Sequence, residues 1–381
     1  MTARTGHVRA AAALTRLATL AVLALAVLPG PAALQARPAD TLPGRLSDAE
    51  FWQIVDKFSE ASGYFQSDNL VSNERQFQNV VPALAKMKRG GVYLGVAPDQ
   101  NFTYILGLEP KIAFIVDIRR GNLHTQLMYK ALLELSHDRA EFVSRLFSRA
   151  RPKGLDARST PAQIFEAYAS ESSSPDLYKE NLAAIDARLT RTHGWPLTDE
   201  DLRGIEYVYS MFCEYGPDLT YSSSGMGLRG GGRVGGGRGG RGMPSYGDLQ
   251  TSTDAEGRSR SYLGTEENFQ ALKAFEEKNL LVPVVGDFAG PKALRSVGQW
   301  IAEHGATVTV YYVSNVEQYL FQNGVAPQFY ANVATLPLDD DSMFLRSARG
   351  LDVLDPIRAL LRDFNEGRIG SWQDVTRRGS H

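Results

Sequence analysis

The sequence predicts an α/β protein with a mostly parallel sheet flanked by helices. Residues 92–96 and 112–118 are short, almost wholly apolar runs with a helical segment between them. Residues 281–286 and 307–313 repeat this arrangement. Runs that are apolar on both faces indicate strands buried on both sides, as in parallel sheets. Each strand–helix–strand run therefore predicts a right-handed βαβ unit, and the fold class is Rossmann-like.

The composition is typical of a soluble globular protein. The chain has 381 residues, of which 43% are hydrophobic and 22% are charged. Its 41 Lys and Arg against 43 Asp and Glu give no reason to expect nucleic acid or an anionic membrane as the main partner. The partner that we expect is a small-molecule ligand in the crevice at the strand ends. Cys213 is the only cysteine, which excludes an intrachain disulfide and a cysteine-cluster zinc site. We expect Cys213 to be a buried thiol that packs as a small hydrophobe.

Residues 1–39 have the pattern of a secretory signal peptide. Three arginines lie within the first 16 residues, a run that is apolar except for Thr19 follows at 17–28, and small residues recur up to Ala36 and Ala39. The run is too short to cross a bilayer comfortably, which takes about 20 residues. We expect cleavage after about residue 36, export to the periplasm or beyond, and no membrane span afterwards. An uncleaved anchor and a misassigned start are the alternatives. Residues 40–381 then form a single α/β domain.

The expected helices of the first part follow from apolar periodicity and capping residues. Ser47 and Glu50 form a capping box, in which each side chain accepts from a free backbone N–H at the helix start. The other expected elements are a helix at 74–88 kinked at Pro82, helices at 102–108 and 124–135, and a strand or helix at 142–147.

Residues 151–280 are expected to form a helical insertion over the sheet. Thr160, Thr198 and Thr265 are helix N-caps, and no clear strand run lies between them. Within this stretch, residues 225–242 contain 11 glycines and 4 arginines. Glycine at this density predicts a disordered loop, because ordering it costs too much entropy. The alternatives are an arginine–glycine arm for nucleic acid and a lid over a ligand.

In the last part, the helix between the second pair of strands begins at Gly290 and ends at Gly305. Ser314 and Glu317 form a second expected capping box, which opens a helix to about residue 321. Further edge strands are expected at 332–338 and 342–346, followed by a final amphipathic helix at 353–363.

Ligands of open α/β sheets bind at the carboxyl ends of the strands, so the loops there hold the candidate site. The candidate residues are Gly95, Asp117, Asp287, Ser314 and Asn315. Asp117 is the most specific, because it ends the second strand about 20 residues after the first turn, where a carboxylate accepts from ribose hydroxyls. Its alternative role is to pair with Arg119 or Arg120, or to cap the next helix. Asp287 is equally explained as a turn-former.

Several chemistries are not supported. The loop after the first strand lacks G-x-G-x-x-G and any Walker pattern, so a diphosphate cradle is not indicated. No G-x-S-x-G nucleophile elbow is present. The six histidines are scattered, so no metal site is expected, and lone His193 and His304 are interpreted as surface residues.

The stretches YLGVAPDQNFTYI, AFIVDIRR, VPVVGDFAGPKALR and VYYVSNVEQYLF look like an uncharacterised bacterial family that resembles class I S-adenosylmethionine-dependent methyltransferases in fold. The resemblance implies S-adenosylmethionine as cofactor, with Asp117 as the acid that holds the ribose. It also implies that the strand ending at Val96 is the first, that the strand to Gly286 with Asp287 is the fourth, and that 307–313 is the fifth. The first loop keeps Gly95 but departs from the glycine-rich pattern of active methyltransferases.

Three functions remain open from the sequence. The leading one is an exported methyltransferase-like protein that acts on an unknown substrate. The second is an exported, non-enzymatic protein that binds another ligand in the same crevice, since a fold does not determine a function. The third is an NADP oxidoreductase, which rests only on Arg119 and Arg120 after Asp117.

Overall fold

The computed structural model describes residues 40–221, 223, 242–348 and 350–378. The signal segment 1–39 and the glycine-rich run, apart from Gly242, lie outside the described residues, so both remain predictions.

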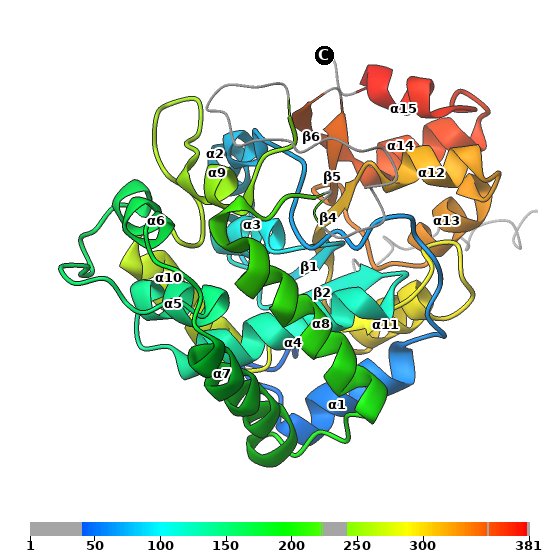
Figure 1. The fold of residues 1–381 in the computed structure, drawn as a ribbon. Helices are drawn as coiled ribbons and strands as arrows, with labels where there is room; N and C mark the ends of the chain where they lie inside the picture. The colour runs from blue at the N-terminus through cyan, green and yellow to red at the C-terminus, as the bar shows by residue number, and fades with distance from the viewer. Residues whose placement is uncertain (1–39, 222, 224–241, 349, 379–381) are drawn as a thin grey trace, which may run out of the picture. The chain divides into compact units, whose positions relative to one another are not determined.

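The centre of the fold is a mostly parallel sheet, as predicted (Figure 1). It has six strands in the order β3-β2-β1-β4-β5-β6. All neighbouring strands run parallel except β5 and β6. The first three strands are buried throughout, which explains their continuous apolar sequences. The strands are β1 (Val92–Gly95), β2 (Ile112–Asp117), β3 (Leu281–Val285), β4 (Val308–Ser314), β5 (Met343–Ala348) and β6 (Leu351–Pro356).

The chain builds the sheet outward from its middle in two directions. It passes from β1 to β2 and β3 on one side, then returns to place β4 beside β1 on the other. The strand order therefore reverses between β1 and β4. In open α/β sheets this reversal opens a crevice at the carboxyl ends of the two strands.

Two strand assignments implied by the resemblance are wrong. The strand 281–285 lies at the edge of the sheet beside β2 and is the third strand along the chain, whereas 308–314, beside β1, is the fourth. The cause is the segment 142–147, whose sequence is compatible with a strand or a helix. It is helical, so no strand of the described chain lies between β2 and β3.

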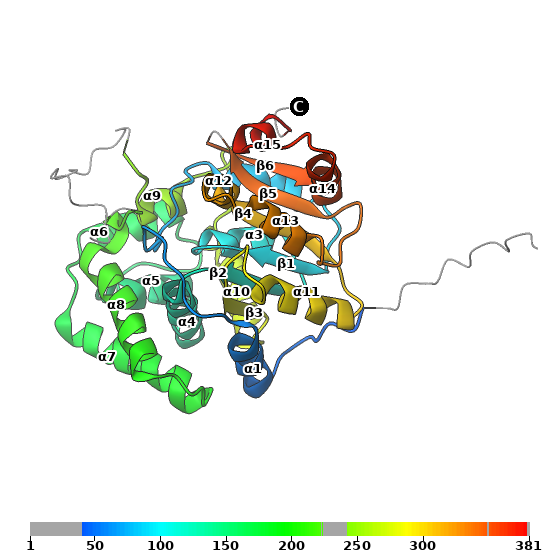
Figure 2. The same ribbon diagram turned by 90° about the vertical axis from the view of Figure 1, so that its right-hand side faces the viewer.

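Helices cover both faces of the sheet. Figure 2 shows α4, α5, α7 and α8 together on one side, with α11 and α13 on the other. The helices before β3 are α1 (Asp48–Phe58), α2 (Val81–Leu84), α3 (Gln100–Leu108), α4 (Arg120–Leu135), α5 (Arg139–Phe147), α6 (Pro161–Ala169), α7 (Pro175–Ala187), α8 (Asp199–Tyr215), α9 (Tyr246–Thr251) and α10 (Glu266–Glu277). Those after it are α11 (Ala293–Glu303), α12 (Val316–Gln322), α13 (Ala326–Val333), α14 (Ile357–Asn365) and α15 (Trp372–Arg378). Short turns are η1 (Phe77–Val80), the π-helical η2 (Arg188–Thr192) and η3 (Gly216–Asp218).

The predicted helix starts are confirmed where a side chain caps the first turn. Ser47 and Glu50 form the expected capping box at α1. Thr160 and Thr198 cap α6 and α8 in the same way, and Thr265 accepts from the N–H of Asn268 at α10. These local interactions are encoded within four residues, which is why the sequence reveals them.

Three expectations for local structure are wrong. Residues 74–76 are not helical. Pro82 does not kink a longer helix but lies in the first turn of the short α2. Proline is tolerated there because the backbone N–H groups of a first turn have no hydrogen-bond partner within the helix. Residues 332–338 contain no strand, since Asn332 belongs to α13. Residues 353–356 are not helical but belong to β6, which runs antiparallel to β5 at one edge of the sheet, so the predicted helix begins only at Ile357.

The expected capping box at the start of α12 does not form. Asn315 is the residue before the helix and makes no side-chain cap. The Ser314 hydroxyl instead donates to Glu74, and Glu317 is buried against Arg346 and Tyr330. Ser314 and Glu317 therefore bind residues distant in the sequence and do not cap the helix between them.

Among the described residues, no helix combines the length and apolar character needed to cross a bilayer.

Candidate functional site

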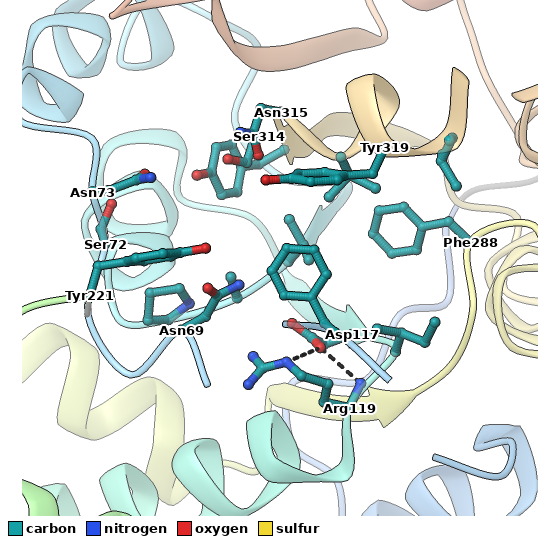
Figure 3. Close-up of a pocket in the computed structure, with 18 of the residues that line it drawn as sticks. Asn69, Ser72, Asn73, Asp117, Arg119, Tyr221, Phe288, Ser314, Asn315 and Tyr319 are labelled. Atoms are coloured by element: carbon teal, nitrogen blue, oxygen red, sulfur yellow. Dashed lines mark hydrogen bonds and ion pairs between the residues drawn. The ribbon is translucent and has the colours of Figure 1, made fainter. Parts of the chain in front are cut away.

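A pocket opens at the carboxyl edge of the sheet, where the strand order reverses. Its empty volume is about 1020 Å³, including the part open to solvent. Residues just after β1, β2, β3 and β4 line it, together with the loop 64–74 and the start of α12 (Figure 3). The pocket thus occupies the crevice that the strand order predicts.

Four of the five candidate residues lie together in this lining: Asp117, Asp287, Ser314 and Asn315. Gly95 is not among the lining residues. A Cβ added to Gly95 would overlap with Oδ1 of Asn101, so this glycine makes room for an internal side chain. Asn101 in turn donates to the carbonyls of Val96 and Pro98, at 2.8 and 2.7 Å, and fixes the loop after β1.

Asp117 is buried at the end of β2, with one carboxylate oxygen engaged. Its Oδ1 accepts from the backbone N–H of Arg119 at 2.9 Å and lies 3.4 Å from the Arg119 Nε. Figure 3 shows both contacts meeting on the same oxygen. Within the described chain, no hydrogen bond reaches Oδ2. Asp117 is therefore paired with Arg119 through Oδ1, which was the alternative to a ligand role. Its Oδ2 can still accept a hydrogen bond from a ligand hydroxyl.

The two arginines after Asp117 point to different partners. Arg119 is buried in the pocket lining, and its Nη1 donates to the carbonyl of Asp68. Arg120 forms a two-pronged pair with Asp201 of α8, at 2.6 and 3.0 Å. Arg120 is not a lining residue of the pocket, so the pair of arginines that suggested NADP does not act at one site.

Three non-glycine residues of the pocket lining adopt the left-handed conformation, and one of them is Asn69, with φ of 48°. The other two are Ala97, with φ of 66°, and Ser314, with φ of 50°, at the ends of the two strands that flank the reversal. Such strained residues cost about 1–3 kcal/mol and persist where neighbours hold them, often at binding sites. Asn122 and Gln126 of α4 donate to the carbonyl of Ala97, at 2.9 and 3.1 Å.

Glu74 is a buried carboxyl in the pocket wall that the sequence did not reveal. It accepts from Ser314 Oγ at 2.5 Å, from Gln100 Nε2 at 2.6 Å and from Tyr312 OH at 2.9 Å. Burial raises the pKa of Glu74, although these hydrogen bonds oppose the shift. A buried acid with a raised pKa in a cleft is a candidate for a functional group.

A second acid lies behind Glu74. Asp352 of β6 accepts from Tyr104 OH at 2.6 Å, and the amide of Gln100 lies 3.3 Å from the same hydroxyl. Burial, followed by repulsion from Glu74, raises the pKa of Asp352 well above its ordinary range. The two carboxyls therefore belong to one network that connects the pocket to the antiparallel edge of the sheet.

The remaining candidate residues, Asp287 and Asn315, also line the pocket. Asp287 Oδ1 accepts from the N–H of Ala289 at 2.9 Å, which is the turn-forming role considered from the sequence. Asn315 lies at the surface of the pocket before α12. Both side chains are only partly buried, so a ligand could still reach them.

Aromatic rings form much of the pocket surface. Phe65 packs edge-on against Tyr319 with ring centroids 5.1 Å apart, and Phe288 stacks on Phe329 at 5.7 Å. In Figure 3 Tyr319 and Phe288 lie on one side of the pocket and Tyr221 on the other. Such a lining, with a few convergent polar groups, is typical of small-molecule sites and suits a planar ring.

The described residues contain no group of three or more His, Cys, Asp and Glu arranged to hold a metal ion. The polar part of the pocket lining consists of carboxyl, amide and hydroxyl groups and the guanidinium of Arg119.

Residues 69–196 and 242–357 match a family described as a domain of unknown function, DUF7790. The chain belongs to this family. No curated protein matches the sequence. The DUF7790 match covers all four parallel strands at the pocket and most of the loop that contributes Glu74, so the site lies within the family domain.

The sequence missed Glu74 and Gln100 for a physical reason. Glu74 lies 240 positions from Ser314, its hydrogen-bond partner, and no local motif links them. In the sequence, Glu74 precedes an amphipathic pattern and is therefore predicted to begin a helix. Only the folded structure shows that its side chain is buried in the pocket wall.

Proposed function

We propose that the DUF7790 domain of this protein binds S-adenosylmethionine or a closely related nucleoside in the pocket, and that the protein is methyltransferase-like. The observation that carries this proposal is Asp117. It ends β2 beside the strand reversal, and its Oδ2 has no hydrogen-bond partner in the described chain. That is the place where a carboxylate accepts from ribose hydroxyls in sheets of this order.

The residues present fit such a ligand in two respects. The aromatic side chains of Phe65, Phe288 and Tyr319 offer surfaces for a planar base. The polar groups of Asn69 and Asn315 line the same space and can fix orientation. Bound S-adenosylmethionine supplies an electrophilic methyl group, so the protein's part would be to hold it and an acceptor close together and aligned.

Binding without chemistry is the second candidate. The loop after β1 favours it, because Gly95 packs on Asn101 and the backbone at Ala97 is held by α4. A loop fixed in this way does not offer the glycine-rich approach of active methyltransferases. Export, which we also propose from the signal pattern, would fit a binding protein equally well.

A thermal-unfolding screen tests the proposal. Ligands at 100 times their dissociation constant stabilise a protein by about 2.7 kcal/mol. We expect S-adenosylmethionine or S-adenosylhomocysteine to raise the melting temperature, and NADP to leave it unchanged. If no adenosine compound shifts unfolding, the proposal fails. If one does, incubation with methyl-labelled S-adenosylmethionine and candidate acceptors separates an enzyme, which releases S-adenosylhomocysteine, from a binding protein.

A further inference from the structure

The charges in the pocket lining do not balance. The lining contains three carboxyl groups, Glu74, Asp117 and Asp287, and one basic side chain, Arg119. Arg119 lies beside Asp117, with 3.4 Å between Nε and Oδ1. This pairing leaves Glu74 without a basic neighbour, and within the described chain neither Glu74 nor Asp352 forms an ion pair with any Lys, Arg or His.

Among the described residues, the groups that interact with Glu74 are neutral or acidic. Gln100 and Tyr104 come from α3, Tyr93 from β1, and Tyr312 and Ser314 from β4. The remaining two neighbours are Ser347 of β5 and Asp352 of β6. The three tyrosines have pKa values raised well above 10 by burial and by the nearby acids, so they remain neutral donors.

A desolvated carboxyl without a basic neighbour is stabilised either by a proton or by a cation that enters the site. The attraction between opposite charges is several times stronger in such an environment than in water. Glu74 is only 9% exposed, yet it lines the pocket, so a ligand can reach it where bulk water screens it little. Hydrogen bonds from Ser314 and Tyr312 hold the carboxyl in place, which removes the need to reorganise when a ligand arrives.

We propose that the pocket selects ligands that carry a positive charge, and that Glu74 is the side chain that sets this preference. The inference rests on the proposed function, because it takes a sulfonium compound as its probe. It also makes ligands with several negative charges poor candidates, since they would face Glu74 and Asp287 together.

The test compares two ligands that differ by one charge. S-adenosylmethionine is a sulfonium cation and S-adenosylhomocysteine is the neutral thioether. We expect the full-length protein to bind the cation about tenfold more tightly, as measured by calorimetric titration. Glu74→Gln should bring the two dissociation constants together, whereas Glu74→Asp, which retains the charge, should keep most of the preference. Glu303→Gln removes one surface carboxylate outside the pocket and should leave the ratio unchanged.

The ratio should also depend on pH. Glu74 is protonated at low pH, so the preference for the cation should be lost as pH falls and be fully present at high pH. Circular dichroism of each variant shows whether it is folded.

Each outcome decides the inference. Equal affinities in the wild type overturn the charge preference but leave the proposed function intact. A preference that survives in Glu74→Gln, or an equal loss for both ligands, shows that Glu74 does not set it. If neither compound binds the folded wild type, both the inference and the proposed function fail.

Discussion

At the scale of single residues, burial decides which acids are candidates for function. Glu74 lies in the loop 64–74 before β1, Asp99 lies in the loop after β1, and both are buried. Their surroundings differ, because Glu74 faces the pocket whereas Asp99 accepts from Gln250 of α9 at 2.7 Å, among buried tyrosines. Histidine placement shows the same effect. His193 was expected at the surface, but it is partly buried between Asp48 and Glu134, at 2.7 and 2.8 Å.

The first residue-level prediction concerns Asp117. Asp117→Asn should abolish the thermal shift caused by S-adenosylmethionine, because an amide cannot accept hydroxyl hydrogen bonds with both of its groups. The unliganded variant should stay folded but lose about 1–3 kcal/mol of stability, since Arg119 loses its charged partner in a buried place. Thermal unfolding with and without ligand measures both effects. Asp341→Asn, at an exposed turn, is the control, and a ligand shift of wild-type size in Asp117→Asn contradicts the ribose role.

The second concerns pH and Asp99. Burial raises the pKa of Asp99 from 3.8 to about 7, against hydrogen bonds from Tyr262 and Gln250 that lower it. The fold therefore favours the protonated carboxyl, and this contribution to stability is full below about pH 3.8 and is lost as pH rises through 7. Asp99→Asn imitates the neutral form, so its stability relative to wild type should increase from pH 4 to pH 8.

The expected change is up to about 4 kcal/mol, at about 1.4 kcal/mol for each pKa unit. Urea unfolding of both proteins at several pH values measures it. Other titrating groups, such as Glu276, whose pKa burial raises to about 7, affect both proteins alike and cancel in the difference. A stability difference that does not vary with pH would show that Asp99 is ionised in the fold.

At the scale of elements, side chains far apart in sequence decide how helices begin and pack. The expected start of α11 at Gly290 is displaced to Ala293, because Glu60 accepts from the backbone N–H groups of Lys292 and Ala293, both at 2.7 Å. The pair α4 and α8 is held in a similar way. His124 of α4 lies 2.9 Å from Asp201, which also forms the capping box of α8 with Thr198.

The packing of α4 on α8 gives the third prediction. Gly204 lies in α8 against His124, and an added Cβ would overlap the imidazole ring. Alanine is about 1 kcal/mol better than glycine within a helix, but overpacking a fixed ring costs about 1–3 kcal/mol. Gly204→Ala should therefore lower the free energy of unfolding despite its better helix propensity.

Gly121 provides the matched control. It lies in the first turn of α4, and an added Cβ would meet nothing within 4 Å. Gly121→Ala should be neutral or slightly stabilising in the same urea experiment. If both variants behave alike, helix propensity and not the His124 contact determines the effect.

At the scale of the whole chain, two predictions rest on the sequence alone. Deleting residues 225–242 should change the melting temperature little, because a loop of the expected disorder contributes little packing and its length has little effect on the entropy of closure. Trypsin should cut first at the four arginines of this run. Strong protection of these sites, or a large loss of stability on deletion, would show that the run is packed.

The last prediction concerns export. Protein recovered outside the cytoplasm should begin between about residues 32 and 40, where small residues follow the apolar run. N-terminal sequencing measures this directly. Soluble cytoplasmic protein that keeps Met1 would contradict both the signal peptide and the exported role that we propose.

The sequence by itself determined the fold class, most helix starts and the position of the crevice. These features depend on local patterns, namely apolar runs for β1 to β4 and four-residue caps such as Ser47 with Glu50. It also placed Asp117, Asp287, Ser314 and Asn315 at strand ends, which the sheet then brings into one pocket lining.

Only the tertiary structure decided the strand order, the role of Ser314 and the existence of the Glu74–Asp352 network. The reason is physical. Whether a carboxyl caps a helix or lies buried in a pocket wall depends on neighbours more than two hundred residues away, and on the water that they exclude.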